Sequence, residues 1–126
     1  DFYLSKLPED MVPFWDLEFG DGSTEPRHSS SAAIVACGLL EMSKYLSEKE
    51  AIYYTDLAKK MVKSLIDYYE VKDSSISNGL LLHGTYSNKS PYNTCNHCGV
   101  DECTIWGDYF FMEALTRLTK DWELYW

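Results

Sequence analysis

Thiol and imidazole side chains gather in one short segment of the chain. Cys95, Cys98 and Cys103 lie close together in the sequence, with His97 beside the second of them. Thiolates and imidazoles at such spacings bind zinc tetrahedrally, but no second Cys-x2-Cys pair completes the usual set of four ligands. We therefore predict incidental free thiols here, ahead of a disulfide or a zinc ion, and we expect neither a metal nor a cofactor.

The loop just before these cysteines carries hydroxyl groups and a cation. Ser87, Lys89, Ser90 and Tyr92 follow one another at short intervals. Hydroxyl donors around a positive charge are suited to an anion such as a sulfate group. Serines in a polar loop are also common turn formers, and residue types alone favour this second interpretation.

Aromatic side chains offer a third kind of chemistry, because their flat faces stack on sugar rings and also fill cores. Phe, Tyr and Trp make up 15% of the chain, a share that suits either use. We predict that Phe14 and Trp15 lie in a core or an interface. Trp106 is equally suited to a core and to the lining of a cleft.

Two further polar residues lie near these groups. His83 follows three leucines, and we predict a hydrogen-bonded structural histidine at the base of the loop rather than an acid–base catalyst. Asp108 falls in the first turn of a predicted helix. A carboxylate there stabilises the helix N-terminus more often than it reaches into a cleft.

The balance of charge excludes some classes of partner. With 20 acidic and 11 basic residues the net charge is −9, which repels nucleic acids and anionic lipid surfaces. No apolar run in the sequence is long enough to cross a membrane. The few, clustered cysteines favour a reducing cytoplasm over a disulfide-rich secreted domain. An anionic sugar stays possible as a ligand, because a local group of donors can hold it.

The first half of the chain is predicted to form two helices behind a long loop. Residues 1–7 are typical of the end of a helix, which Pro8 terminates, and an aromatic-rich loop follows over residues 11–27. One of the serines at 29–31 is the expected N-cap of an apolar helix that runs to residue 46. Ser47 and Glu50 form a capping-box pattern for a second, amphipathic helix with apolar residues up to position 69.

The second half is predicted to hold an extended piece over residues 79–87, an irregular loop over 87–103 and a third helix over 105–119. This third helix is apolar on most faces, like the first, whereas the second is amphipathic. Alternation of buried and exposed helices is typical of a double ring of helices, in which outer helices screen inner ones. Three helices cannot close such a ring, so we expect missing neighbours from the rest of a longer chain or from another copy.

Several motifs in these segments resemble one known family. They are the aromatic loop, the PRxSS run before an alanine-rich helix, LLHGxYS at 81–87, IWGDYF at 105–110 and DWELYW at 121–126. Together they resemble the C-terminal third of the unsaturated glucuronyl hydrolases, along nearly the whole chain. The resemblance implies an all-α fold that forms part of an (α/α)6 toroid of six helical hairpins. Residues 1–126 would be a single C-terminal segment of that toroid, incomplete without the N-terminal part.

The resemblance also implies a function. Bacterial enzymes of this family are cytoplasmic and act on unsaturated disaccharides that lyases release from glycosaminoglycans such as chondroitin and hyaluronan. An aspartic acid protonates the C4=C5 double bond and activates water, and the hemiketal that forms opens to release the second sugar. The catalytic Asp pair of the family lies in its N-terminal half, so we expect no catalytic residue here and no activity from this segment alone. The alternative is a free-standing helical module that binds carbohydrate or another protein.

Substrate-binding residues follow from the same resemblance. Ser87 and Ser90 match the two serines of a Ser-x-x-Ser-x-Lys pattern that contacts the far sugar and its sulfate. Tyr92 stands at the lysine position, so a preference for sulfate is in doubt unless Lys89 takes over the charge. Trp106 is assigned to the cleft for stacking. His28 replaces an aspartate of the family pattern, which predicts a weaker anchor for the neighbouring Arg27.

Overall fold

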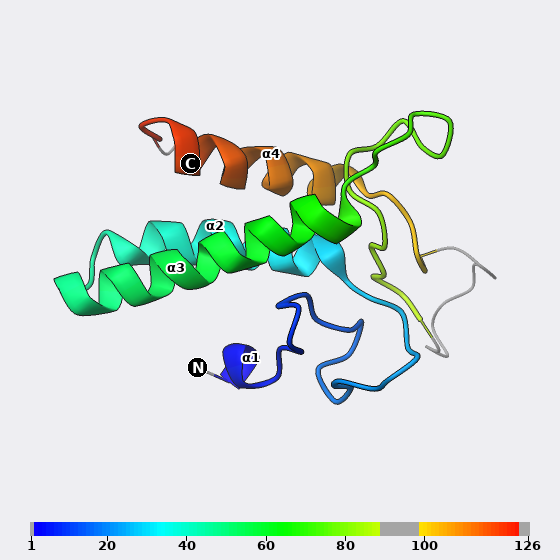
Figure 1. The fold of residues 1–126 in the computed structure, drawn as a ribbon, viewed down its shortest axis with the longest axis horizontal. Coiled ribbons are helices and arrows are strands. Elements are labelled where there is room, and N and C mark those ends of the chain that lie inside the picture. Colours follow the sequence, from blue (N-terminus) through cyan, green and yellow to red (C-terminus); the bar gives the residue numbers. More distant parts are fainter. Residues whose placement is uncertain (1, 89–98, 124–126) are drawn as a thin grey trace.

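The computed structural model describes residues 2–88 and 99–123, and within them the chain is helical. The helices are α1 (Phe2–Ser5), α2 (Ser29–Ser43), α3 (Glu48–Ser64), the π-helix η1 (Leu65–Tyr69) and α4 (Ile105–Thr119). Helix α2 packs against both α3 and α4, and the three long helices lie side by side (Figure 1). The described ranges contain isolated β-bridges but no named strand. The predicted all-α class is therefore confirmed.

Helix α2 begins where the serines predict, but the predicted capping is wrong. The N-cap position belongs to His28, whose side chain makes no capping hydrogen bond. Ser29 is already helical, and its Oγ donates to the Leu82 carbonyl at 2.5 Å while its backbone N–H donates to the His83 carbonyl at 3.1 Å. The start of α2 is thus bound to the extended segment rather than capped by its own residues.

Helix α3 follows its sequence signals closely. Its N-terminus has the predicted capping box, in which the Glu50 carboxylate accepts from the Ser47 backbone N–H at 3.3 Å. One stripe of the helix is buried against α2, and it continues into η1: Ala58, Met61, Val62 and Leu65. The opposite face carries charged residues in water, so the predicted amphipathic helix is confirmed.

The core between the helices combines small residues on α2 with large ones on its neighbours. Alanines at positions 32, 33 and 36 are completely buried and let the other helices approach closely. Phe111 of α4 and Leu65 of η1 fill the space beside them. Gly107 is part of this close approach, because a Cβ there would lie 2.8 Å from the Thr104 hydroxyl and 3.1 Å from Ser30 Cβ.

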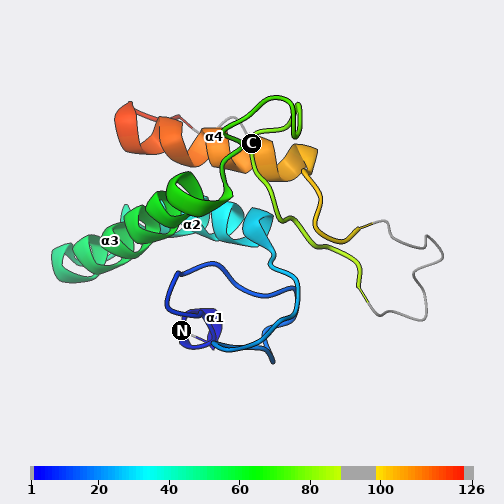
Figure 2. The ribbon, with the colours of Figure 1, turned by 45° about the vertical axis from the view of Figure 1, so that its right-hand side comes forward.

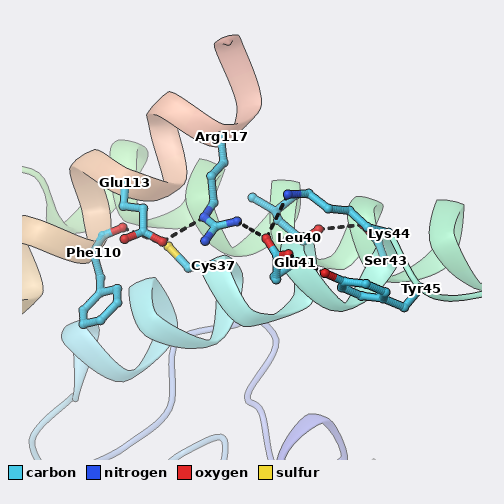
Figure 3. A network of polar contacts seen from close by, with 9 residues as sticks. All are labelled: Cys37, Leu40, Glu41, Ser43, Lys44, Tyr45, Phe110, Glu113 and Arg117. Carbon is cyan, nitrogen blue, oxygen red and sulfur yellow. Dashed lines mark hydrogen bonds and ion pairs between the residues drawn. The ribbon is translucent and has the colours of Figure 1, made fainter. Parts of the chain in front are cut away.

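A network of polar groups joins α2 to α4 on the side of this core (Figure 3). Arg117 donates from Nε to Glu113 on its own helix at 2.8 Å and from Nη1 to Glu41 on α2 at 2.6 Å. The buried Cys37 thiol lies beside this network and donates to the Phe110 carbonyl at 3.3 Å. Two carboxylates on different helices therefore share one guanidinium, which sets how α2 and α4 lie along each other.

Parts of the two apolar helices are uncovered. Helix α4 exposes Ile105, Tyr109 and Met112, which recur at helical spacing on one face, and α2 exposes Ile34. An apolar stripe of this kind is normally buried against another element. Missing neighbours from a longer chain or another copy therefore stay a prediction. No helix in the described part of the chain combines the length and apolarity needed to cross a bilayer.

The irregular segments lie toward one end of the helices. The start of α2, the end of η1 and the start of α4 meet there, and the loops after Pro8 and after Tyr69 extend from it (Figures 1 and 2). The helical packing brings these two loops, which are far apart in sequence, to the same region. Of the residues predicted to bind a ligand, Trp106 lies at this end, in the first turn of α4.

Candidate functional site

The segment with the sequence LLHGTYS (residues 81–87) pairs with residues 99–102, just before α4, and we call these two stretches the paired segment. Gly84 and Glu102 exchange two backbone hydrogen bonds of 2.8 and 2.9 Å, and the N–H groups of Tyr86 and Ser87 both donate to the Gly99 carbonyl. Gly99 has a φ of +83°, and a Cβ on it would lie 2.9 Å from Ser87 Cβ. Glycine is required there both for the left-handed backbone and for the close approach.

Glu102 organises the side chains of this paired segment. One carboxylate oxygen accepts from the Gly99 N–H at 2.9 Å and the other from the Tyr86 hydroxyl at 3.2 Å. The Tyr86 ring then meets the Trp106 ring edge to face, with centroids 5.1 Å apart. Tyr86 is 50% exposed and Trp106 38% exposed, so these rings present a partly open aromatic surface next to Ser87.

Trp106 lies outside the buried core and is 38% exposed, and a role in lining a cleft stays a prediction. The ring lies at the first turn of α4 and is not part of the buried core clusters. It is placed beside the loop that carries Ser87, through Tyr86. Tyr86 and Glu102 were missed by the sequence analysis, because neither residue type signals a bond that forms only when the two segments pair.

His83 lies at the base of the paired segment, as predicted. Its Nδ1 is 2.5 Å from a carboxylate oxygen of Asp101, and its ring packs edge to face on Tyr69 with centroids 5.8 Å apart. A carboxylate only accepts, so Nδ1 carries the proton in this pair. The interpretation of His83 as a hydrogen-bonded structural histidine is consistent with these contacts.

Asp108 has a role that the sequence did not suggest. Its two carboxylate oxygens accept from the backbone N–H groups of Leu80 and Leu81, each at 2.9 Å. The side chain turns away from its own helix to hold the extended segment. Asp108 therefore fixes the start of the LLHGTYS stretch against α4.

The aromatic loop before α2 is anchored by Arg27 in spite of His28. Arg27 donates to Asp10 at 2.8 Å and to the Val12 carbonyl, and its guanidinium stacks over the buried Phe14 ring at 4.2 Å. Asp10 thus supplies the carboxylate that the family pattern would place at position 28. Arg27 therefore has a carboxylate partner although position 28 holds a histidine. Burial lowers the pKa of the His28 imidazole, which favours its neutral form.

Asp10 also contacts the last residue of η1. The Tyr69 hydroxyl donates to the same carboxylate oxygen at 2.8 Å. Burial, followed by this carboxylate, raises the pKa of Tyr69 well above its usual range. The phenol therefore stays a hydrogen-bond donor, and one chain of contacts runs from Arg27 through Tyr69 to His83.

Several predicted site residues lie outside the described residues. They are Lys89, Ser90 and Tyr92 of the proposed sugar contacts and Cys95, His97 and Cys98 of the cysteine segment. Among residues 2–88 and 99–123 no group of three or more His, Cys, Asp or Glu side chains is arranged to hold a metal. Cys103, also a free thiol, accepts from the Ser77 hydroxyl at 3.1 Å.

An open hollow of about 610 Å³ lies elsewhere, between the first loop and the end of α3. Its walls are mostly charged, and the charges largely neutralise one another through the pairs Arg27–Asp10 and Lys63–Asp67. The aromatic surface at Tyr86 and Trp106 does not line it. Side-chain chemistry therefore favours the paired segment over this hollow as the functional site.

Comparison with known proteins agrees with the resemblance noted above. No family model matches the chain. It is 47% identical over its whole length to an unsaturated chondroitin disaccharide hydrolase of Streptococcus agalactiae, and 44% identical to one of Streptococcus pneumoniae. In each case it spans 31% of the relative's length.

Solved structures give the same result. The fold superposes with a TM-score of 0.85 on an unsaturated glucuronyl hydrolase mutant of S. agalactiae in complex with dGlcA-GalNAc6S. This match is 46% identical and covers 99% of the chain and 32% of that protein. The unsaturated glucuronyl hydrolases have an α/α toroid fold. Along nearly its entire length, this chain is homologous to about a third of an unsaturated glucuronyl hydrolase.

Proposed function

We propose that the chain is the C-terminal segment of an enzyme that hydrolyses unsaturated glycosaminoglycan disaccharides. In this proposal it supplies contacts to the second sugar and part of the toroid wall. The rest of the toroid, which comes from the remainder of a longer chain, holds the catalytic residues. The observation that carries the proposal is the homology over the whole chain to unsaturated chondroitin disaccharide hydrolases.

The exposed apolar faces support the proposal that further helices of the toroid come from outside this chain. Ile105, Tyr109 and Met112 on α4 would be covered by neighbouring helices of a closed toroid. The chain spans about a third of the relatives' length, which leaves enough sequence to supply those helices. Another copy of the chain is the alternative cover, and a cytoplasmic location goes with the proposed enzyme.

The chemistry proposed for the complete enzyme is a hydration followed by ring opening. A carboxylic acid donates a proton to C4 of the C4=C5 double bond, and water adds at C5. The hemiketal at C5 opens to a ketone, which leaves a hemiacetal at C1. The hemiacetal collapses to an aldehyde, and the second sugar leaves with its oxygen protonated. Common glycosidases instead act at the anomeric carbon with paired carboxylates.

The proposed substrate contacts are Ser87, Lys89, Ser90, Tyr92 and Trp106. Ser87 lies beside the partly exposed rings of Tyr86 and Trp106, which suits a sugar with a polar edge and an apolar face. The nearby described charges are the carboxylates of Asp101 and Glu102. We therefore propose unsaturated glycosaminoglycan disaccharides as the substrate class. Tyr92 brings no positive charge to the lysine position of the family pattern, so a sulfate on the sugar would depend on Lys89 for a cationic partner.

The test uses the native gene product purified from its full reading frame. It should consume an unsaturated chondroitin disaccharide, with loss of the absorbance of the conjugated double bond, whereas residues 1–126 alone should not. Ser87→Ala should raise KM with little change in kcat, because the contact is to a part of the substrate that does not react.

Ser74→Ala is the matched control, because Ser74 is an exposed serine in a turn far along the chain from this loop. It should leave both kinetic constants unchanged. Unchanged kinetics in Ser87→Ala would refute the contact role of this loop. A reading frame no longer than this chain, without activity on the disaccharide, would favour the free-standing binding module instead.

A further inference from the structure

Two residues with unusual backbone conformation face each other across the base of the paired segment. His83 has a φ of +63° and Asp101 a φ of +58°. Both are non-glycine residues in the left-handed region, which L-amino acids with a Cβ adopt only at a cost in free energy. They flank the backbone pair formed by Gly84 and Glu102. Two such residues at one place call for an interaction that holds them.

That interaction is the hydrogen bond between the two side chains. The Nδ1 of His83 lies 2.5 Å from Oδ1 of Asp101. We call this pair the latch. A bond from an imidazole N–H to a carboxylate is stronger than one between neutral groups, although both side chains are partly open to water. The left-handed conformation at each residue aims its side chain at the other.

Each half of the latch is fixed by a further group. The Asp101 backbone N–H donates to the buried Thr85 hydroxyl at 2.9 Å, and the His83 carbonyl accepts from the Ser29 N–H at the start of α2. The edge of the His83 ring meets Tyr69. The latch therefore ties the paired segment to the helical core on one side and to the first loop, through Tyr69 and Asp10, on the other.

The position of the latch in the chain determines which residues it can influence. Beyond it lie Tyr86 and Ser87 on one side, with the aromatic surface and the proposed sugar contact, and Gly99 on the other. The Glu102 carboxylate accepts from both Gly99 and Tyr86. Among the described residues, the backbone bonds that join the two stretches are those of the Gly84–Glu102 pair and those to Gly99. A glycine at 84 is needed for that pair, because a Cβ there would lie 2.9 Å from the Glu102 carbonyl oxygen.

We propose that His83 and Asp101 are positioning residues that set the geometry of the sugar-contacting segment. The inference rests on the proposed function, and it assigns neither residue a direct contact with substrate. Loosening the latch leaves the reacting groups untouched but lets Ser87 and Tyr86 move relative to Trp106. The complete enzyme should then bind the disaccharide more weakly at an unchanged rate of the chemical step.

Two variants of Asp101 and one control variant in the native protein separate the bond from the backbone strain. Asp101→Gly accepts the positive φ but deletes the carboxylate, and we expect KM to rise about three- to tenfold with kcat within about twofold, the effect of one lost hydrogen bond. Asp101→Asn keeps an acceptor and tolerates the left-handed backbone, so it should stay within about twofold of the parent KM. Asp73→Gly is the control, because it makes the same replacement at an aspartate that accepts from the Ser75 N–H within its own turn; it should leave KM unchanged.

Hydrogen exchange without substrate gives an independent measurement. The amides of Gly84 and Glu102 should exchange faster in Asp101→Gly than in the parent and in Asp101→Asn. His83→Asn combined with Asp101→Gly should add little to either single change, since both remove the same bond. If the native protein does not act on the disaccharide, the proposed function fails, while faster exchange would still establish the latch.

Two outcomes would overturn the inference itself. One is exchange at Gly84 and Glu102 that is the same in Asp101→Gly as in the parent. The other is faster exchange in that variant while KM for the disaccharide stays at the parent value in an active enzyme. The latch would then be a structural bond without influence on the sugar contacts.

Discussion

Replacement of Arg117 by methionine should destabilise the fold far more than loss of an ordinary surface ion pair. The side chains of Arg117 and Glu113 are only 6% and 3% exposed, and their N–O distance is 2.8 Å. Removing one partner of a buried pair leaves the other charge without compensation and costs about 3–5 kcal/mol. The variant also loses the bond to Glu41 and the stacking of the guanidinium over Trp122 at 5.0 Å. We therefore expect Arg117→Met to lower the free energy of unfolding by about 4 kcal/mol.

The assay is equilibrium unfolding of the native protein in urea, followed by circular dichroism and by tryptophan fluorescence. Lys59→Met is the matched control, because Lys59 pairs with Asp56 at 3.3 Å and both side chains are more than half exposed. It should change the free energy of unfolding by less than about 1 kcal/mol. Equal effects of Arg117→Met and Lys59→Met would refute the reasoning from burial.

A second substitution tests whether the uncompensated charge is the cause. Glu113→Gln in the Arg117→Met background replaces a buried carboxylate by a neutral amide, which costs less to keep out of water. The double variant should be more stable than Arg117→Met alone by about 1–3 kcal/mol. A double variant that is less stable than the single one would show that lost packing, and not the charge, dominates.

Three further outcomes follow from burial. Phe111→Ala should cost about 3–5 kcal/mol in urea unfolding, because the ring is almost fully buried in the core; a loss below about 1 kcal/mol would mean that the site collapses around the cavity. Burial, and then the charge of Glu113, raise the pKa of the Cys37 thiol to about 12. When the folded protein is treated with iodoacetamide, mass spectrometry should therefore find the label on Cys103 well before Cys37. Rapid labelling of Cys37 would contradict this order. Burial raises the pKa of Tyr3 from 10.0 to about 12. The stability that Tyr3 contributes is therefore complete below pH 10 and is lost as the pH rises toward 12. Tyr3→Phe should show a shallower fall of Tm over that range, and parallel Tm curves of variant and parent would exclude this contribution.

The local sequence determined the helices, because capping residues and the spacing of apolar residues act over one or two helical turns. The capping box at Ser47 and Glu50 and the apolar stripe behind it define α3 without reference to any other segment. The composition of α2 and α4 indicates two helices with broad apolar surfaces, and the structure shows such surfaces both in the core and in the open. The motifs around Trp106 were enough to indicate the family, which the comparisons with known proteins bear out.

Tertiary structure alone decided how the candidate site is built, because its bonds join residues far apart in the chain. One of the serines at 29–31 was expected to cap the helix, yet the Ser29 hydroxyl donates to the Leu82 carbonyl instead. Asp10 and Asp101 carry no local sequence signal, and their partners Arg27 and His83 become neighbours only when the loops meet at one end of the helices. A short polar side chain can bond to its own backbone or to a distant group with similar energy. Packing of the helices brings the distant group within reach, so the choice between the two is made by the fold as a whole.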